Sequence, residues 1–310
     1  VAIKVLWPSL AKEGVYVARF LREAKAASRV RHRNVVELLD YGEAAGGLVY
    51  SVMELLEGQD LQDLLESQLE GRLGWVQACG LLVQIASGLK AAHGRGVIHR
   101  DIKPANCFLT EEDDEPVVKL VDFGVAKLED DRGQTLTGVA QVVGTPSYIA
   151  PEMVRSRAPA SPRTDVYALG VLAYQMLTGR VPFKAKTFFE LMRQVCFEPV
   201  PSLRDQAPGI PPAVEAFVLE LLAKDPEHRP PDMATVRARL VALSQETLGP
   251  QAVELQGSSR LVVHPIASGP PPIALAEPIV SWEPVSEVAA GSTEVLPRPD
   301  EPWHHAGGGW

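Results

Sequence analysis

The segment HRDIKPANCFL, residues 99–109, places three side chains of different chemistry in one short loop between apolar elements. Asp101 offers a carboxylate, Lys103 an ammonium group and Asn106 a side-chain amide. Three such groups can converge on one small volume. Asp and Asn are also common in ordinary loops, so this segment by itself leaves a structural explanation open.

A second acidic residue, Asp122, follows the apolar run 117–121 and precedes Phe123 and a glycine. A carboxylate at the end of a strand is a typical position for a ligand of a hard metal ion. Asn106 and Asp122 together offer oxygen ligands but no complete coordination shell. This pair favours Mg²⁺, because Mg²⁺ keeps several waters and takes further ligands from substrate phosphates.

The apolar segment VAIKVLW opens the chain at residues 1–7, and Lys4 is its first ionisable side chain. Its small and β-branched residues predict a buried strand that carries one cation. Desolvating an ammonium group is costly, so a lysine in a buried strand needs a partner. The sequence thus predicts an acidic or anionic group close to Lys4.

The elements that must position these residues change in character near residue 58. Before it, a helix is predicted over 16–30, followed by two strands, 35–41 and 48–55, joined by a glycine-bearing loop as a hairpin. After it, the pattern is mainly helical. Helices are predicted over 75–93, 164–177, 187–195, 213–223 and 232–244.

Composition places the 310-residue chain among globular proteins, with 46% hydrophobic and 22% charged residues. Its net charge of −9 gives no support to binding of nucleic acid or anionic membranes. The three cysteines form no metal-binding or disulfide pattern, which favours a reducing cytoplasmic location. No apolar run approaches ~18 residues, so no membrane span is expected in this chain, although a full-length protein could be membrane-tethered.

The character of the sequence changes again after about residue 246. Ten prolines fall between Pro250 and Pro302, among Gly, Ser, Glu and Ala, with little periodicity. Such a segment cannot bury enough apolar surface to offset the entropy lost on ordering. We expect residues 246–310 to form a disordered tail.

Four short segments follow one another along the chain: VAIK at 1–4, HRDIKPAN at 99–106, DFG at 122–124 and GTPSYIAPE at 144–152. As an ordered set they resemble the signature of the eukaryotic-type protein kinase family, over residues 1 to about 243. The surrounding sequence resembles that of bacterial members of the family. The segment DIKPAN, with Lys103, resembles the catalytic segment of the members that phosphorylate serine or threonine.

The resemblance implies a two-lobed fold of the α+β class. Residues 1–58 would form a small, β-rich and incomplete N-lobe, and residues 59–245 a larger helical C-lobe, before the tail. The glycine-rich strand–turn–strand that covers ATP phosphates in this family would precede Val1 and is not in this sequence. We therefore expect the opening strand at a sheet edge, weak ATP binding and low phosphoryl transfer.

Carried over residue by residue, the resemblance implies catalytic roles for five side chains. Asp101 would accept the proton of the attacking hydroxyl, and Lys103 would steady the transferring phosphoryl group. Asn106 and Asp122 would bind Mg²⁺, or Mn²⁺ in its place. Lys4 would contact the α- and β-phosphates of ATP.

The partner of Lys4 and the adenine site can be placed in the same way. Glu23, within FLREA, resembles the ion-pair partner of Lys4, and Glu13 and Glu37 are nearby alternatives. Met53 would line the back of the pocket, although Met53 and Phe108 can each equally be a core residue. The other residues expected around the adenosine are Ala2 and Phe108 against the ring, the backbone of Glu54 and Leu56 at the adenine edge, and Asp60 at the ribose.

The segment 122–152 resembles the activation loop of these kinases. Thr137, and Thr135 as a second site, lie near its centre and are the expected phosphorylation sites, with Arg100 and Lys127 as cations for the phosphate. Both threonines can also be ordinary solvated residues.

Further residues are expected to shape the scaffold and the substrate site. Glu152 should form a buried ion pair with Arg229, and Asp165 should cap the backbone of the catalytic loop. Thr145 should lie beside Asp101. Cys107 should pack as a small hydrophobe.

The resemblance implies a serine/threonine protein kinase that uses ATP, acts on protein substrates and can dimerise for trans-autophosphorylation. Two alternatives remain: a catalytically silent kinase-like scaffold and a small-molecule phosphotransferase. The presence of Lys4, Asp101 and Asp122 disfavours the first, and the GTPSYIAPE segment disfavours the second.

Overall fold

The computed structural model describes residues 1–44, 46–123, 146–155 and 159–248. The chain divides into two compact units, Val1–Leu261 and Val262–Trp310, and every described residue lies in the first. Most of the predicted activation loop, with Lys127, Thr135, Thr137 and Thr145, falls outside the described residues, as does the tail from 249 onward.

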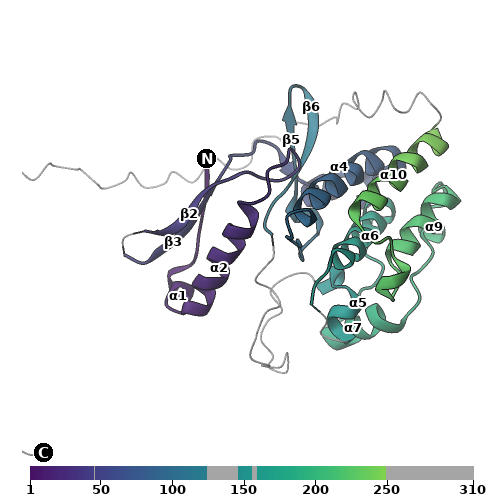
Figure 1. The fold of residues 1–310 in the computed structure, drawn as a ribbon. Helices are drawn as coiled ribbons and strands as arrows, with labels where there is room; N and C mark the ends of the chain where they lie inside the picture. The colour runs from purple at the N-terminus through teal and green to yellow at the C-terminus, as the bar shows by residue number, and fades with distance from the viewer. Residues whose placement is uncertain (45, 124–145, 156–158, 249–310) are drawn as a thin grey trace, which may run out of the picture. The chain divides into compact units, whose positions relative to one another are not determined.

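A small antiparallel sheet with the strand order β1-β3-β2 forms the N-terminal part (Figure 1). Its strands are β1 (Ala2–Val5), β2 (Leu38–Ala44) and β3 (Leu48–Met53), and the helices beside it are α1 (Pro8–Ala11) and α2 (Gly14–Ala27). Pairing of Ala44 with Leu48 confirms the predicted hairpin, and β1 lies at the edge of this sheet as expected.

Two expectations about this sheet are wrong. The opening strand is not buried, because β1 pairs only with β3 within the described sheet and Ile3 remains 63% exposed. The first hairpin strand begins at Leu38 rather than Val35. Its predicted first residues bind elsewhere, since the Val36 N–H donates to the Leu120 carbonyl and Val35 forms a parallel bridge with Leu120.

A second small sheet has two strands that lie, along the chain, between the two predicted acidic positions of the site, Asp101 and Asp122. Its strands are β4 (Gln59–Asp60), β5 (Cys107–Glu112) and β6 (Glu115–Leu120), in that order across the sheet. Asp113 and Asp114 both have left-handed φ values, 53° and 62°, which suits a tight turn between β5 and β6. The loop with Asp101 therefore enters β5, and Asp122 follows the end of β6.

Helices make up the larger part after residue 60. The α-helices are α3 (Leu61–Ser67), α4 (Trp75–His93), α5 (Pro151–Arg155), α6 (Pro162–Thr178), α7 (Phe188–Phe197), α8 (Leu203–Gln206), α9 (Pro212–Leu221) and α10 (Met233–Leu248). Short 3-10 helices are η1 (Leu69–Gly71), η2 (Pro104–Asn106), η3 (Pro146–Tyr148) and η4 (Pro226–His228). Among the described residues no helix is both long and apolar enough to cross a membrane.

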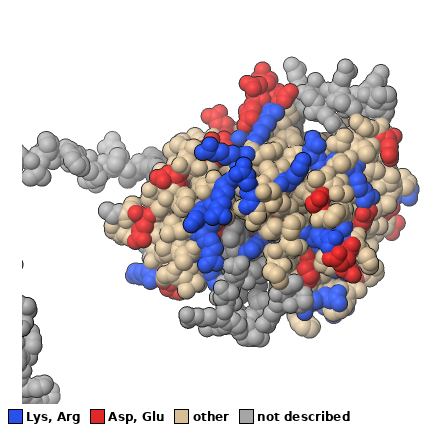
Figure 2. All heavy atoms as spheres, in the orientation of Figure 1, with Lys and Arg blue, Asp and Glu red and all other residues tan. Residues whose placement is uncertain are grey.

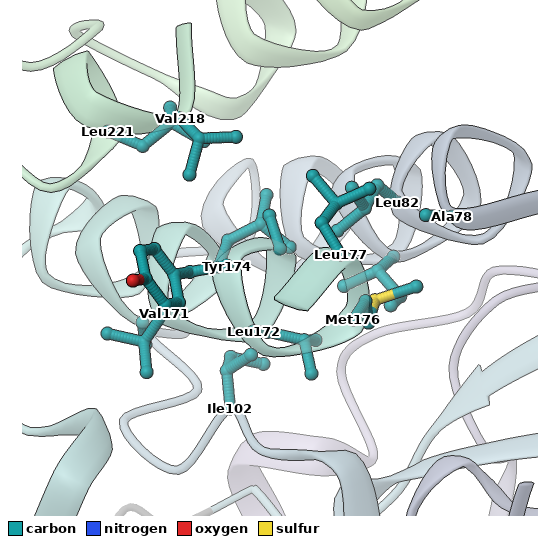
Figure 3. Close-up of a cluster of buried hydrophobic side chains, with 14 of the residues drawn as sticks. Ala78, Leu82, Ile102, Val171, Leu172, Tyr174, Met176, Leu177, Val218 and Leu221 are labelled. Carbon is teal, nitrogen blue, oxygen red and sulfur yellow. The ribbon is translucent and has the colours of Figure 1, made fainter. Parts of the chain in front are cut away.

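Helix α6 forms the centre of the main core. It begins at Pro162 because Ser161 and Thr164 form a reciprocal capping box there. Its side chains are buried on nearly all sides, between α4, α9 and the catalytic loop (Figure 3). Ile102, between Asp101 and Lys103, is fully buried against this helix, so the core anchors the loop that carries the candidate catalytic groups.

Candidate active site

Asp101, Lys103 and Asn106 meet as the sequence predicts. The Lys103 ammonium lies 3.0 Å from the Asp101 carboxylate. The Asn106 side-chain amide donates to the same carboxylate oxygen at 2.8 Å and to the Asp101 carbonyl at 2.7 Å. Asp101 is half-buried, so its carboxylate is held in place yet open to solvent. The cluster can orient a hydroxyl and place a cation beside it.

Asp165 caps the backbone of this loop, as expected. Its fully buried carboxylate accepts the N–H groups of His99 and Arg100, each at 2.9 Å, and lies 2.7 Å from His93 Nε2. Arg100 has a left-handed φ of 66°, which is unfavourable for a side chain other than glycine. Its N–H bond to Asp165 helps to hold this conformation immediately before Asp101.

His99 joins the loop to the segment after β6, a role that sequence reasoning missed. Its Nδ1 lies 3.3 Å from the Asp101 N–H, and its Nε2 lies 3.2 Å from the Val121 carbonyl. Burial lowers the pKa of His99, which favours the neutral ring. A neutral ring with the proton on Nε2 satisfies both contacts, and the ring packs on Phe123 at 4.6 Å between centroids.

Lys4 contacts Asp122 across a long sequence separation. The ammonium lies 2.6 Å from the Asp122 carboxylate, and both side chains are about half exposed. Asp122 has a left-handed φ of 53°, so the chain turns sharply at this residue. Lys4 thus has the acidic partner that its position predicts, and that partner is the predicted metal ligand.

Glu23 and Met53 line the same pocket as Lys4 and Asp122. The full lining is Lys4, Phe20, Glu23, Ala24, Ala27, Val36, Leu38, Ser51, Met53, Asp122 and Phe123. Glu23 thus lines the pocket together with Lys4, and the ion pair between these two residues stays a prediction. Of its alternatives, Glu13 precedes α2 as the N-cap residue, and Glu37 is exposed and uses its backbone groups toward Glu54.

The other side chains predicted around adenosine, Ala2, Asp60 and Phe108, do not line that pocket. Ala2 pairs with Met53 across β1 and β3, and Asp60 pairs with Phe108 across β4 and β5. Asp60 also caps α3, because its carboxylate accepts the Asp63 N–H at 2.9 Å. An adenine site at these residues stays a prediction.

The connecting segment, residues 54–58, runs between β3 and β4 and ends at a glycine that cannot be replaced freely. Gly58 has a φ of 139°, and a Cβ there would lie 2.0 Å from the Leu109 carbonyl oxygen. The Glu54 N–H donates to the Glu37 carbonyl at 3.0 Å. Any adenine contact of Glu54 would therefore use its carbonyl oxygen.

Asn106 and Asp122 have the donor chemistry that Mg²⁺ requires. The amide nitrogen of Asn106 is committed to Asp101, which leaves the amide oxygen as the atom for a ligand. Val121 N–H donates to the Asn106 carbonyl at 3.0 Å and so ties the two predicted ligands to each other. These oxygen donors fit a magnesium ion that is shared with phosphates.

Two expected scaffold features are confirmed. Arg229 forms a bidentate ion pair with Glu152, in which both N–O distances are 2.8 Å. The Arg229 side chain is fully buried. Arg229 also donates to the carbonyls of Arg163 and Ala223. Cys107 is fully buried as a small apolar residue, and burial raises the pKa of its thiol.

Comparison with known proteins gives a family match over most of the chain. The protein kinase domain family matches residues 1–240. Serine/threonine-protein kinase pkn3 of Myxococcus xanthus is 40% identical over 254 residues, covering 79% of this chain and 45% of the relative. PknB of Mycobacterium tuberculosis is 38% identical, covering 78% and 38%, and PkaA of Streptomyces coelicolor is 36% identical, covering 97% and 53%. The chain spans about half or less of the length of these curated relatives.

Solved structures agree with this match at the level of the fold. The PknI kinase domain of Mycobacterium tuberculosis has a TM-score of 0.60 and 27% identity, covering 77% of this chain and 84% of the PknI chain. Rad53 1–466 in complex with AMP-PNP has a TM-score of 0.60 and 28% identity, covering 76% and 56%. With a family match over residues 1–240 and a catalytic loop organised around Asp101, this chain belongs to the protein kinase family.

Proposed function

We propose that the chain transfers the γ-phosphoryl group of ATP to serine or threonine hydroxyls of proteins. The observation that carries the proposal is the convergence of Lys103 and Asn106 on the carboxylate of Asp101. Phosphoryl transfer needs alignment and charge neutralisation more than covalent help, and this cluster offers both beside a solvent-accessible carboxylate. The names of the bacterial relatives support the acceptor class.

In the proposed mechanism, Asp101 takes the proton of the substrate hydroxyl. The hydroxyl oxygen forms a bond to the γ-phosphorus while the bond from that phosphorus to the ADP oxygen breaks. Asn106 holds the Asp101 carboxylate at the correct angle, and Lys103 is 3.0 Å from it, close enough to neutralise charge on the transferring group. Bound Mg²⁺ supplies positive charge to the phosphate oxygens.

Nucleotide binding would exchange the partners of Lys4 and Asp122. In the structure the two side chains neutralise each other at 2.6 Å. A bound nucleotide offers phosphate oxygens to the Lys4 ammonium and leaves the Asp122 carboxylate for the metal ion. Glu23 lines the same pocket and would then steady Lys4 from the other side.

Phosphorylation of Thr137, with Thr135 second, is proposed as the activating step. The proposal rests on the sequence, because both residues lie outside the described part of the chain. Of the two cations expected to contact the phosphate, Arg100 lies in the described part of the chain, next to Asp101. Dimerisation for trans-phosphorylation and a cytoplasmic location belong to the same proposal.

The proposal is tested by incubating the 310-residue chain with labelled ATP, Mg²⁺ and a generic basic protein. We expect label on serine and threonine of that protein, and peptide mapping should find phosphate on Thr137. Asp101→Asn should lower the transfer rate by about 10²-fold or more, because the proton acceptor is lost. The variant keeps the shape of the side chain, so its thermal unfolding should match that of the wild-type chain.

The alternatives predict different results in the same assay. A silent scaffold would give equal background labelling for the wild-type chain and Asp101→Asn. A small-molecule phosphotransferase would consume ATP in the presence of small hydroxyl compounds and leave the protein substrate unlabelled. Either result would contradict the proposed function.

A further inference from the structure

Lys119 is a largely buried cation that the proposed chemistry does not use. It lies on β6, its side chain is 9% exposed, and its ammonium contacts two carboxylates, Glu54 at 3.1 Å and Glu112 at 2.9 Å. Burial opposes the charged form, but the hydrogen bonds to Glu112 and Glu54 outweigh it and raise the pKa of Lys119 above its ordinary value. Lys119 is therefore charged at neutral pH, and a lysine is seldom buried in this form unless it is paired, as Lys119 is with these two carboxylates.

Through Glu54, Lys119 fixes the first residue of the connecting segment 54–58. The Glu54 carboxylate oxygen that Lys119 contacts also accepts the Glu37 N–H at 2.8 Å. The Glu54 N–H in turn donates to the Glu37 carbonyl at 3.0 Å. Backbone and side chain of Glu54 are thus both tied, which sets the direction of its carbonyl, the atom proposed to contact adenine.

Lys119 also lies beside the residue proposed to pack on the adenine ring. Lys119 is the register partner of Phe108 on β5, and Phe108 is the register partner of Asp60 on β4. Directly opposed residues in antiparallel strands project to the same face of a sheet. Asp60, Phe108 and Lys119 therefore form one row across the second sheet, and Lys119 connects this row to Glu54.

We propose that Lys119 is a positioning residue that holds Glu54 and the connecting segment in the geometry that binds the purine base. The inference deepens the proposed kinase function and rests on it. Lys119 contacts neither phosphate nor acceptor in this account, so its loss should act on base recognition rather than on the transfer step.

A purely structural ion network is the alternative, and Arg33 provides a matched control. Arg33 contacts Glu112 at 3.1 Å and Glu115 at 3.5 Å, so it shares Glu112 with Lys119, but within the described part of the chain it makes no ion pair with Glu54. Acidic side chains gather near it at the tip of the β5–β6 hairpin (Figure 2). Arg33 is about half exposed, and replacing it removes a cation of the network and leaves the Glu54 contacts intact.

The test compares the binding of MgATP and of magnesium tripolyphosphate, which lacks the base, to the full 310-residue chain by calorimetry. Lys119→Met should raise the Kd for MgATP about tenfold and leave the Kd for tripolyphosphate unchanged. KM for ATP should rise with little change in kcat, and Lys119→Arg should retain most of the affinity. Arg33→Met should bind both ligands as the wild type does.

Glu54→Gln keeps the shape of the side chain and covers the case in which Lys119→Met does not fold. It should produce the same selective loss of MgATP affinity. Equal loss for both ligands, an unchanged Kd for MgATP, or the same loss in Arg33→Met would overturn the positioning role. If the wild-type chain binds and uses MgATP while the variants match it, this inference alone fails; if the wild type neither binds MgATP nor transfers phosphate, the proposed function fails with it.

Discussion

Asp101 reaches its position through the contacts of its neighbours. Asn106 orients the Asp101 carboxylate, and His99 contacts the Asp101 backbone N–H. The Asp165 carboxylate accepts the N–H groups of His99 and Arg100, the two residues before Asp101. The residue types at Asp101, Lys103 and Asn106 indicated that the three groups could converge, and the kinase resemblance gave each of them an expected role. The role of His99 was missed because a histidine in a loop gives no sign of which two backbone groups its ring will join.

The protonation of His99 should make stability depend on pH. Burial lowers the pKa of His99, so just below the ordinary histidine pKa of about 6.5 the unfolded chain binds a proton that the native protein does not. The stability linked to His99 is therefore complete above about pH 6.5 and is lost as the pH falls through the native pKa. We expect Tm to fall on acidification from about pH 7 to about pH 5, and to fall less steeply in His99→Gln.

His228→Gln is the matched control for this measurement. His228 is exposed on η4 and lies far along the chain from the catalytic loop. This variant should keep the wild-type slope of Tm against pH. An identical slope in His99→Gln and the wild-type chain would contradict the neutral, buried state assigned to His99.

At the scale of elements, local periodicity predicted what each segment is but not where it docks. Helix α4 has the predicted bounds, because its apolar pattern is long and regular. Strand β2 was predicted three residues too early, because the backbone of 34–36 pairs with β6 instead of continuing the strand. That pairing is a tertiary contact, and no periodicity in 35–41 could reveal it.

Two glycines of α4 test this docking. A Cβ on Gly88 would lie 2.6 Å from the Asn34 carbonyl oxygen and 2.9 Å from Leu120, whereas a Cβ on Gly80 would meet nothing within 4 Å. Gly80→Ala should raise the free energy of unfolding by about 1 kcal/mol, because alanine is the better helix former. Gly88→Ala should lower it by about 1–3 kcal/mol, because the segment must move away from the helix.

Urea unfolding of both variants measures the two effects on one helix. If Gly88→Ala is stabilised as much as Gly80→Ala, segment 34–36 does not dock on α4 as described. If both variants are destabilised equally, helix propensity at these sites has been misjudged and the comparison no longer supports close packing at Gly88.

At the scale of the whole molecule, the account depends on groups that come from distant parts of the chain. Lys4 and Asp122 are 118 positions apart, and Glu152 and Arg229 are 77 apart. The kinase resemblance predicted the second pair and both members of the first. It did not predict that Lys4 and Asp122 contact each other directly, since that depends on which charged partners are present in the site.

The most direct test of the central claim is a crystal structure of the chain with Mg²⁺ and a saturating non-hydrolysable ATP analogue. We predict that Lys4 leaves Asp122 for the phosphates, that Asn106 and Asp122 supply oxygen ligands to the metal ion, and that Asp101 faces the γ-phosphate. Phosphates bound elsewhere, with the Lys4–Asp122 contact still at its present 2.6 Å, would contradict the account.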